Sequence, residues 1–561
     1  MRRPAKAGGF RARQRGAIGF FGVLNLLLAL IFTAMAVDAG RLWFERRKVQ
    51  AVADIAALEA ARNLGCGGNP GNALAAAQAA ADRNGFTGDL SVAVGGLTTV
   101  DGLRQFNTDT SNESAHVVAT KPVPASLVLG GLFGQTTRMS AEATARAEPA
   151  HATFSAGSYL ARVSATDKDA NLLSALLGSL LGSSLSLDVL SYQGLASTEV
   201  NLLQLVKASA SVGTVEELLA ADLTVADVIG LTATALGQQG VVDASVTAAM
   251  QNLLTATVNN LDVRLGEVLD VSMPGSDAAA KVGINVFDLI TTTILVANKE
   301  RAVSLPSLSV NLGGLLNINV SVDIISPPQI AVGPPGRDAA TGLWCTQART
   351  AQLGVTASVV ANVLGLANID LGLGVQLAQG EAHLETLDLT PGATQAVIGA
   401  TPGIAALNLT NAAGSGPAMI KLLGLTIATI APLDLSIQPP SPTDLVFPID
   451  SPVAEHLPTA TQSVSSSIGS SLESALSNPD LIHIELLPDS LGPLLDLLLG
   501  LLGLDLNDLL GDLLSEVLAP LLGFIGGAVL DPLLKLLGIQ LGGLDVTIQN
   551  IQYNGGARLV I

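Results

Sequence analysis

The feature that most constrains this chain is a long apolar segment near its N-terminus. Residues 17–37 form a run of 21 uncharged residues in which Asn25 and Thr33 are the polar exceptions. At about 1.5 Å rise per residue, a helix of this length covers roughly 31 Å, the thickness of a bilayer's hydrocarbon core. The sequence therefore predicts a transmembrane helix, anchored by side chains that include Ala17, Ile18, Phe20, Phe21, Leu26, Leu30 and Val37.

The charges that flank this run predict its orientation. Residues 1–16 carry six basic residues and no acidic one. Basic residues beside a span stay on the cytoplasmic side, so we expect a cytoplasmic N-terminus and an exported bulk. The basic cluster Arg46, Arg47 and Lys48 weakens the asymmetry, although Asp38 and Glu45 offset it.

A cleaved secretory signal is the alternative, because the small residues Ala34 and Ala36 resemble a cleavage site. The apolar run is longer than the usual segment of about 7 to 15 residues in such signals. Helical spacing of apolar residues also continues to Leu64, without proline, and Gly65 is a plausible stop. These features favour an uncleaved anchor.

The next part of the chain predicts a small α+β unit. An alanine-rich helix is expected over 72–84, and strands over 90–94, 116–120 and 136–147. Residues 17–148 should therefore form a long helix packed on a small antiparallel sheet.

This region resembles a known family. The stretches 13–18, 37–42 and 49–58, followed by the alanine-rich helix and the Lys-Pro-Val-Pro segment at 121–124, are similar to the N-terminal region of TadE/TadG-like proteins of Flp (tight adherence, type IVb) pilus assembly. The resemblance covers residues 13–148. It implies a non-catalytic, single-pass protein of the bacterial inner membrane, whose partners are membrane lipid and other pilus assembly or envelope proteins in the periplasm. Phe21 stands where a prepilin would have glutamate, so prepilin-peptidase processing is not expected.

The remaining chain predicts a large, strand-rich α+β periplasmic region. We expect a basic cytoplasmic tail, a transmembrane helix, a helix-plus-sheet module, a mixed domain, a proline-rich connection and a leucine-rich helical segment with terminal strands. Their predicted bounds are 1–16, 17–37, 38–148, 149–431, 432–463 and 464–561. The leucine-rich segment is not expected to enter a membrane, because Asp505, Asp508, Asp512 and Glu516 give its helix an acidic face.

Charge excludes one class of partner. Residues 1–48 hold ten of the 28 basic and two of the 47 acidic residues, which leaves a formal charge of −27 on the rest. Binding of nucleic acid depends on cationic groups that displace counterions from phosphates, so nucleic acid is not an expected partner.

Cys66 and Cys345 are the only cysteines. In an oxidising periplasm they have one possible pairing, and two separate buried thiols are the alternative.

Candidate sites for chemistry are few. A strand over 381–385 would place His383 between Glu381 and Glu385 on one face, and His483 with Glu485 repeats the pattern. A solvated strand face is the favoured interpretation, since further clustered metal ligands are missing from the sequence. Asp270 to Pro274 does not match the metal motif of a von Willebrand A domain, because Pro274 replaces the second serine. We therefore expect no catalytic, cofactor or metal-binding residues.

Two rival functions remain open at this stage. Amphipathic strands with leucine-rich helices could line a groove for acyl chains, which would make the protein a periplasmic carrier of hydrophobic ligands anchored in the inner membrane. A periplasmic hydrolase that uses the carboxylates around His383 is the other rival.

Overall fold

We describe the protein from a computed structural model. It describes residues 17–560 except for a set of gaps, which are 67, 101–102, 110, 127–135, 158–166, 241–242, 259–260, 274, 300–301, 305–315, 339–340, 364–366, 389–394, 404, 414–415, 423–424, 431–432, 438–440, 450–459, 465–483, 487–538, 541–542 and 554–555. The chain divides into two compact units. Unit 1 comprises residues 1–147 and 557–561, and unit 2 comprises residues 148–556. The predicted domain bounds beyond residue 148 stay predictions.

Unit 1 begins with a long helix, of which only the second half is buried against the rest of the unit. Helix α1 runs from Ala17 to Ala61 without a break, and Gly65 follows it with a positive φ of 93°. Helix α2 (Pro70–Arg83) starts two residues earlier than predicted, because Asn69 caps it and Pro70 suits its first position. Gly85, with φ of 65°, turns the chain away after α2.

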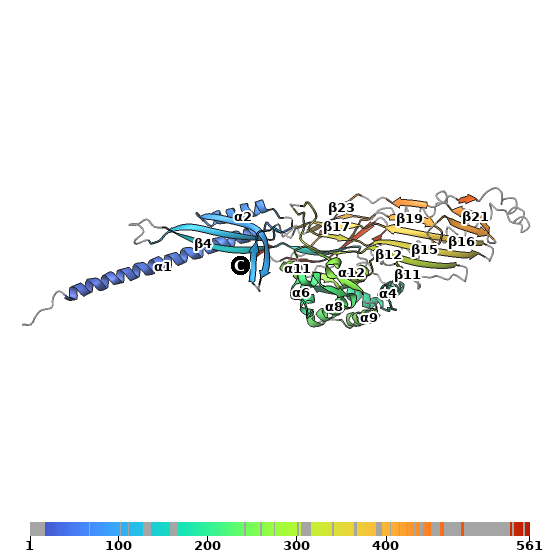
Figure 1. The fold of residues 1–561 in the computed structure, drawn as a ribbon, viewed down its shortest axis with the longest axis horizontal. Helices are drawn as coiled ribbons and strands as arrows, with labels where there is room; N and C mark the ends of the chain where they lie inside the picture. Colours follow the sequence, from blue (N-terminus) through green and yellow to red (C-terminus); the bar gives the residue numbers. More distant parts are fainter. Residues whose placement is uncertain are drawn as a thin grey trace, which may run out of the picture. The chain divides into compact units, whose positions relative to one another are not determined.

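The sheet of unit 1 has the strand order β2-β1-β3-β4-β28. Its strands are β1 (Asp89–Val100), β2 (Leu103–Asn107), β3 (Ser114–Pro124), β4 (Thr136–Glu148) and β28 (Gly556–Leu559). The pairs β1–β2, β1–β3 and β3–β4 are antiparallel, which confirms the predicted type of sheet. Figure 1 shows α1 running along this sheet. The sequence did not predict β2, nor that the last strand of the chain would join the N-terminal sheet.

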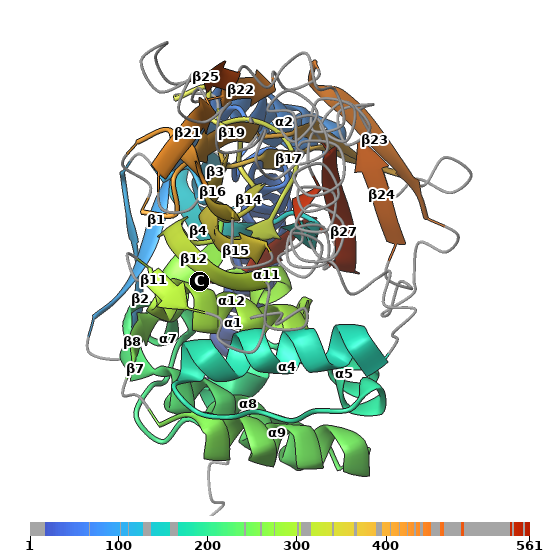
Figure 2. The same cartoon turned by 90° about the vertical axis from the view of Figure 1, so that its right-hand side faces the viewer.

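Unit 2 combines a helical layer with several sheets. Its helices are α4 (Asp167–Leu181), α5 (Val189–Ala196), α6 (Leu202–Ala208), α7 (Val215–Ala220), α8 (Val225–Gln239), α9 (Ala244–Ala256), α10 (Leu265–Val268), α11 (Asp277–Lys281) and α12 (Val286–Ala297). Figure 2 shows α4, α5, α8 and α9 grouped beside α12. Helix α4 contributes buried leucines to this layer, among them Leu176, Leu180 and Leu181.

The helical layer repeats a short strand that turns directly into a helix. Strands β6 (Glu199–Asn201), β7 (Asp222–Thr224), β8 (Asp262–Arg264) and β10 (Gly283–Asn285) each precede a helix, and they pair as β6–β10 and β7–β8. The sequences EVNLLQL, DLTVADV, DVRLGEV and GINVFDL share apolar positions two, four and seven and an Asp, Glu or Gln at position six. That spacing places the polar sixth residue three positions after the helix cap, where a capping box forms.

The largest sheet of unit 2 packs against the helices. Its order is β11-β12-β15-β16-β20-β21-β25, and β19 pairs with both β16 and β22. Its strands are β11 (Ala302–Ser304), β12 (Leu316–Ser326), β15 (Gln352–Val363), β16 (Ala367–Leu377), β19 (Ala405–Thr410), β20 (Ala418–Leu422), β21 (Leu425–Ile430), β22 (Leu433–Ile437) and β25 (Ile484–Leu486). One face of β12, β15 and β16 joins the same apolar core as the helices.

Two further sheets enclose a second core. One has the order β24-β27-β5-β13-β9, with β26 paired to β27, and the other has the order β14-β17-β18-β23. Phe154, Ile398 and Phe447 are among the side chains buried there. The strands are β5 (His151–Ala156), β9 (Leu269–Val271), β13 (Ile330–Gly333), β14 (Gln347–Arg349), β17 (Glu381–Asp388), β18 (Gln395–Thr401), β23 (Thr443–Pro448), β24 (Ala460–Val464), β26 (Ile539–Gln540) and β27 (Gly543–Gln552).

These elements confirm the predicted α+β, strand-rich class. The predicted terminal strands of the leucine-rich segment lie in β27 and β28. The predicted acidic helix face, with Asp505, Asp508, Asp512 and Glu516, lies outside the described residues.

Candidate functional site

The first half of α1 is apolar and uncovered. Exposed fractions of the predicted anchor side chains are 69 % for Phe20, 64 % for Leu26 and 53 % for Val37, and Phe21 and Leu30 are similarly exposed. The side chains of Ala17 and Ile18 lie outside the description. Among the described helices, α1 is the one long and apolar enough to cross a membrane, with a mean hydropathy of 2.4 in its most apolar stretch.

The second half of α1 is packed. Val49, Val52, Ala53, Ala56 and Ala60 are all buried, and the helix lies against α2 and β3. Alanine side chains let the helix approach its neighbours closely, at the cost of little side-chain entropy. The face predicted to pack on the protein's own sheet does so, and Leu58 at its margin is only partly buried.

Polar contacts tie α1 to the far end of β3, just beyond the apolar half. Arg41 donates to the carbonyl oxygen of Pro124, and Ser126 donates to the Asp38 carboxylate. Lys121 Nζ donates to Glu45 Oε2 at 3.1 Å, and this bond holds the pKa of Glu45 below its ordinary value. These contacts fix the direction in which the apolar half leaves the sheet.

At the same level, α1 also carries exposed aromatic and basic side chains. Trp43 and Phe44 are 60 % and 55 % exposed. The Arg47 guanidinium lies 4.8 Å from the centre of the Trp43 ring, and Lys48 Nζ lies 4.6 Å from that of Phe44. The charges are evident from the sequence, whereas their pairing with aromatic rings at a spacing of four residues is seen only in the structure.

The His383 side chain belongs to a stack of three side chains, with Trp344 and Arg337. Glu381, His383 and Glu385 share one face of β17, as predicted, and His383 Nε2 lies 3.2 Å from Glu385 Oε1. The imidazole stacks on the Trp344 ring at 3.9 Å between centres. Arg337 covers the same ring at 3.6 Å.

Burial lowers the pKa of His383, and its bond with Glu385 opposes that shift. Glu381 forms an ion pair with Arg349, whose Nε lies 3.6 Å from Glu381 Oε1. Within the described residues, no group of three or more His, Cys, Asp or Glu side chains could hold a metal ion. His483, from the second His-x-Glu pair, lies outside this description.

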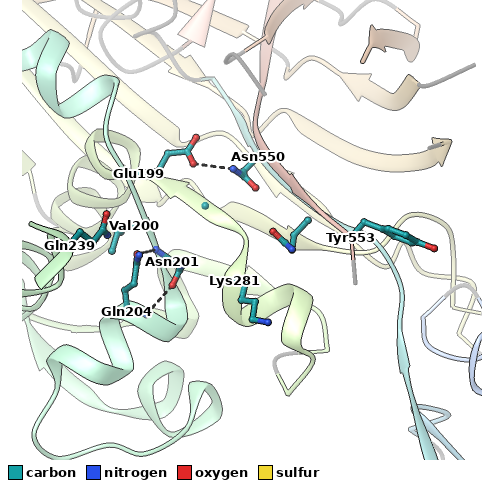
Figure 3. Close-up of a pocket in the computed structure, with 10 residues that line it drawn as sticks. Glu199, Val200, Asn201, Gln204, Gln239, Lys281, Asn550 and Tyr553 are labelled. Atoms are coloured by element: carbon teal, nitrogen blue, oxygen red, sulfur yellow. Dashed lines mark hydrogen bonds between the residues drawn. The ribbon is translucent and has the colours of Figure 1, made fainter. Parts of the chain in front are cut away.

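Unit 2 contains a cavity of about 590 Å³ with a mainly polar lining (Figure 3). It is lined by Glu199, Val200, Asn201, Gln204, Gln239, Lys281, Gly283, Asn550, Gln552 and Tyr553. Glu199 Oε2 accepts a hydrogen bond of 3.0 Å from Asn550 Nδ2. Amide side chains both donate and accept, so the cavity suits a hydroxyl- or amide-bearing ligand and not an acyl chain. The sequence did not reveal this cavity, because its lining combines residues near β6 with residues of β27 that are far apart in the chain.

Comparison with known families identifies the N-terminal part. Residues 16–63 match the model of a TadE/G-like Flp pilus-assembly family, and residues 59–145 match a Tad-like Flp pilus-assembly family. The N-terminal part is Tad-like. This confirms the resemblance. The two matches together cover α1, α2, β1, β2, β3 and most of β4. We call unit 1, which also contains β28, the Tad-like module.

Residues 169–295, beyond the Tad-like module, match a domain of unknown function, DUF8293. That match covers the helical layer with its strand-to-helix repeats. No curated protein and no solved structure matches the chain.

Proposed function

We propose that the protein is a membrane-anchored, non-catalytic structural or assembly component of a Tad/Flp-type pilus system. The observation that carries this proposal is the division of α1. The side chains of its first half are apolar and exposed. Those of its second half are largely buried in the core of the Tad-like module. Such a helix joins an anchor rigidly to a folded body.

The proposed topology is a single pass through the bacterial inner membrane. Residues 17–37 span the bilayer, the basic tail stays in the cytoplasm, and the Tad-like module and unit 2 lie in the periplasm. The charge of the tail supports this direction. Other pilus assembly or envelope proteins are the proposed partners, since both families that match the N-terminal part are Flp pilus-assembly families.

A test of the anchor uses charged substitutions in the bare half of α1. Leu26→Arg combined with Leu30→Arg adds about 2.5 to 3.5 kcal/mol per residue to the cost of insertion, so the protein should leave the membrane fraction. Leu74→Arg with Leu103→Arg is the matched control, because these leucines are exposed on the folded module, at 53 % and 69 %. The control protein should remain in membranes.

The topology is tested separately in spheroplasts. External protease should digest unit 2 while an epitope placed before residue 16 stays protected. Protection of unit 2, or membrane retention of the Leu26/Leu30 double variant, would contradict the proposal.

We also propose that Cys66 and Cys345 form a disulfide in the exported protein. They are the only cysteines, and the periplasm is oxidising. Loop-closure entropy gives such a bridge roughly 4 to 5 kcal/mol at most. Intact-mass measurement after alkylation should show no added label without reductant and two labels with it; label in both samples would reject the pairing.

A further inference from the structure

The basic residues at 46–48 form a patch with the neighbouring aromatic rings. We define the cationic-aromatic patch as Trp43, Phe44, Arg46, Arg47 and Lys48, all of which are exposed. At about 100° per residue, Trp43, Arg46 and Arg47 lie on the side of α1 opposite Arg41 and Glu45, whereas Phe44 lies between the two sides. Because Arg41 and Glu45 contact β3, Trp43, Arg46 and Arg47 face away from the sheet, and Lys48 lies at the edge of the patch near Glu45.

The patch lies just past the apolar half of α1. Along the helix axis, Trp43 is about 9 Å and Lys48 about 16 Å beyond Val37. The headgroup layer of a bilayer is roughly 5 to 8 Å thick on each side. Side chains on a helix tilt toward its N-terminus, which here means back toward the membrane, and long basic side chains can extend further in that direction.

The charge of the patch is unusual for this part of the chain. Beyond residue 48 the sequence carries 18 basic against 45 acidic residues. Lys48 also lies 3.7 Å from Glu45, but Arg46 and Arg47 form no ion pair among the described residues. Arg47 instead interacts with a ring face, since its guanidinium lies 4.8 Å from the centre of the Trp43 ring. Positive charge presented beside aromatic rings at the edge of a span is complementary to anionic phosphate groups.

We propose that the cationic-aromatic patch binds the headgroups of anionic phospholipids in the leaflet on the far side of the span. This inference rests on the proposed anchor. Trp43 and Phe44 sit at the interface, and Arg46, Arg47 and Lys48 attract the phosphates within about one Debye length. The patch thereby sets the depth of the anchor and holds the Tad-like module against the membrane surface.

The two tryptophans of the chain allow a direct test. In the full chain with Trp344→Phe, Trp43 is the only tryptophan. The protein is reconstituted with phosphatidylcholine, and brominated phosphatidylglycerol or brominated phosphatidylcholine is added as the quencher. Trp43 should prefer phosphatidylglycerol by roughly five-fold, the factor that one basic residue supplies near an anionic surface. Salt should reduce the preference, and inorganic phosphate at the lipid concentration should not abolish it.

Matched variants distinguish lipid binding by the patch from an effect of the protein's net charge. Arg46→Gln, Arg47→Gln and Lys48→Gln together should reduce the preference to about one. Arg83→Gln, Arg104→Gln and Arg138→Gln change the net charge equally at exposed sites elsewhere in the Tad-like module and should retain it.

Flotation of the same vesicles distinguishes two kinds of failure. If the protein floats with the lipid but Trp43 shows no preference, or the two triple variants behave alike, the patch proposal is wrong and the anchor stands. If the protein does not float, both proposals are wrong.

Discussion

Gln549 of β27 enters the capping box of helix α12. In the capping box of α6, the backbone N–H of the cap residue Asn201 donates a hydrogen bond of 2.8 Å to Oε1 of Gln204, the third helical residue. At α12 the corresponding N–H, that of Asn285, donates instead to Gln549 Oε1 at 2.8 Å. Gln549 Nε2 then donates to the Asp288 carboxylate at 2.6 Å. One buried amide thus joins the helical layer to the last strand of unit 2.

Gln549→Ala is expected to destabilise unit 2 more than the loss of an ordinary capping box. The substitution leaves the backbone N–H of Asn285 unsatisfied in the interior, and such groups cost about 1 to 3 kcal/mol each. Gln204→Ala, in the partly exposed box of α6, should cost about 1 kcal/mol or less. Thermal unfolding of the full chain in detergent compares the two variants; an equal shift would contradict this role of Gln549.

His151 predicts a loss of stability in weak acid. Its ring is fully buried, with Nδ1 2.9 Å from the Pro149 carbonyl oxygen and Nε2 3.2 Å from Ser276 Oγ. Burial lowers the pKa of His151 below its ordinary value of 6.5. Below pH 6.5 the unfolded chain therefore binds a proton that the folded chain does not, and stability falls as the pH decreases.

His151→Gln should flatten this dependence, because glutamine forms hydrogen bonds without titrating. The unfolding temperature measured from pH 7.5 to 5.0 checks the effect. A slope that is the same in both proteins would exclude His151 as its source.

At the scale of elements, the alanines of α1 set its distance from α2 and β3. Ala56→Leu adds three carbon atoms at a position with no exposed surface, and overpacking of this kind costs about 1 to 3 kcal/mol. Ala51→Leu makes the same change on the exposed side of the helix. We expect proteolysis of the Tad-like module to accelerate in the first variant only, and equal rates would contradict the packing.

The sequence predicted those elements whose signal is local. The apolar run of α1, the strands over 90–94 in β1 and 116–120 in β3, and the stop at Gly65 each depend on neighbouring residues, and each was predicted. The strand-to-helix repeats were also local, in EVNLLQL and GINVFDL, but strands of three residues are too short for alternation to reveal.

Features that depend on distant pairing could not be predicted. Gln549 lies 264 residues from Asn285 along the chain, and the polar cavity combines residues from both regions. Nothing in the sequence near Trp344 indicated that it would stack on His383. Such contacts form only once the sheets have assembled, so a single sequence carries no signal for them.

At the scale of the molecule, the chain passes twice between the units. It leaves the Tad-like module after Ala147, forms unit 2, and returns at Ala557, so that unit 1 includes residues from both ends of the described chain. The N–H of Val560 donates to the carbonyl oxygen of Thr144 at 2.9 Å. Misfolding of unit 2 that displaced the final residues would therefore also expose strand β4 at the edge of the module's sheet.

Removal of residues 557–561 tests this dependence. Strand β4 would become an edge strand without β28, and its freed backbone groups would exchange with water and be open to pairing with other chains. We expect faster hydrogen exchange in β4 when the truncated chain is compared with the chain of 561 residues, with α12 and β27 unchanged. Leu559→Ala removes a 40 % exposed side chain but keeps the backbone, so it should preserve protection. Unchanged exchange in the truncated protein would mean that the sheet is stable without its last strand.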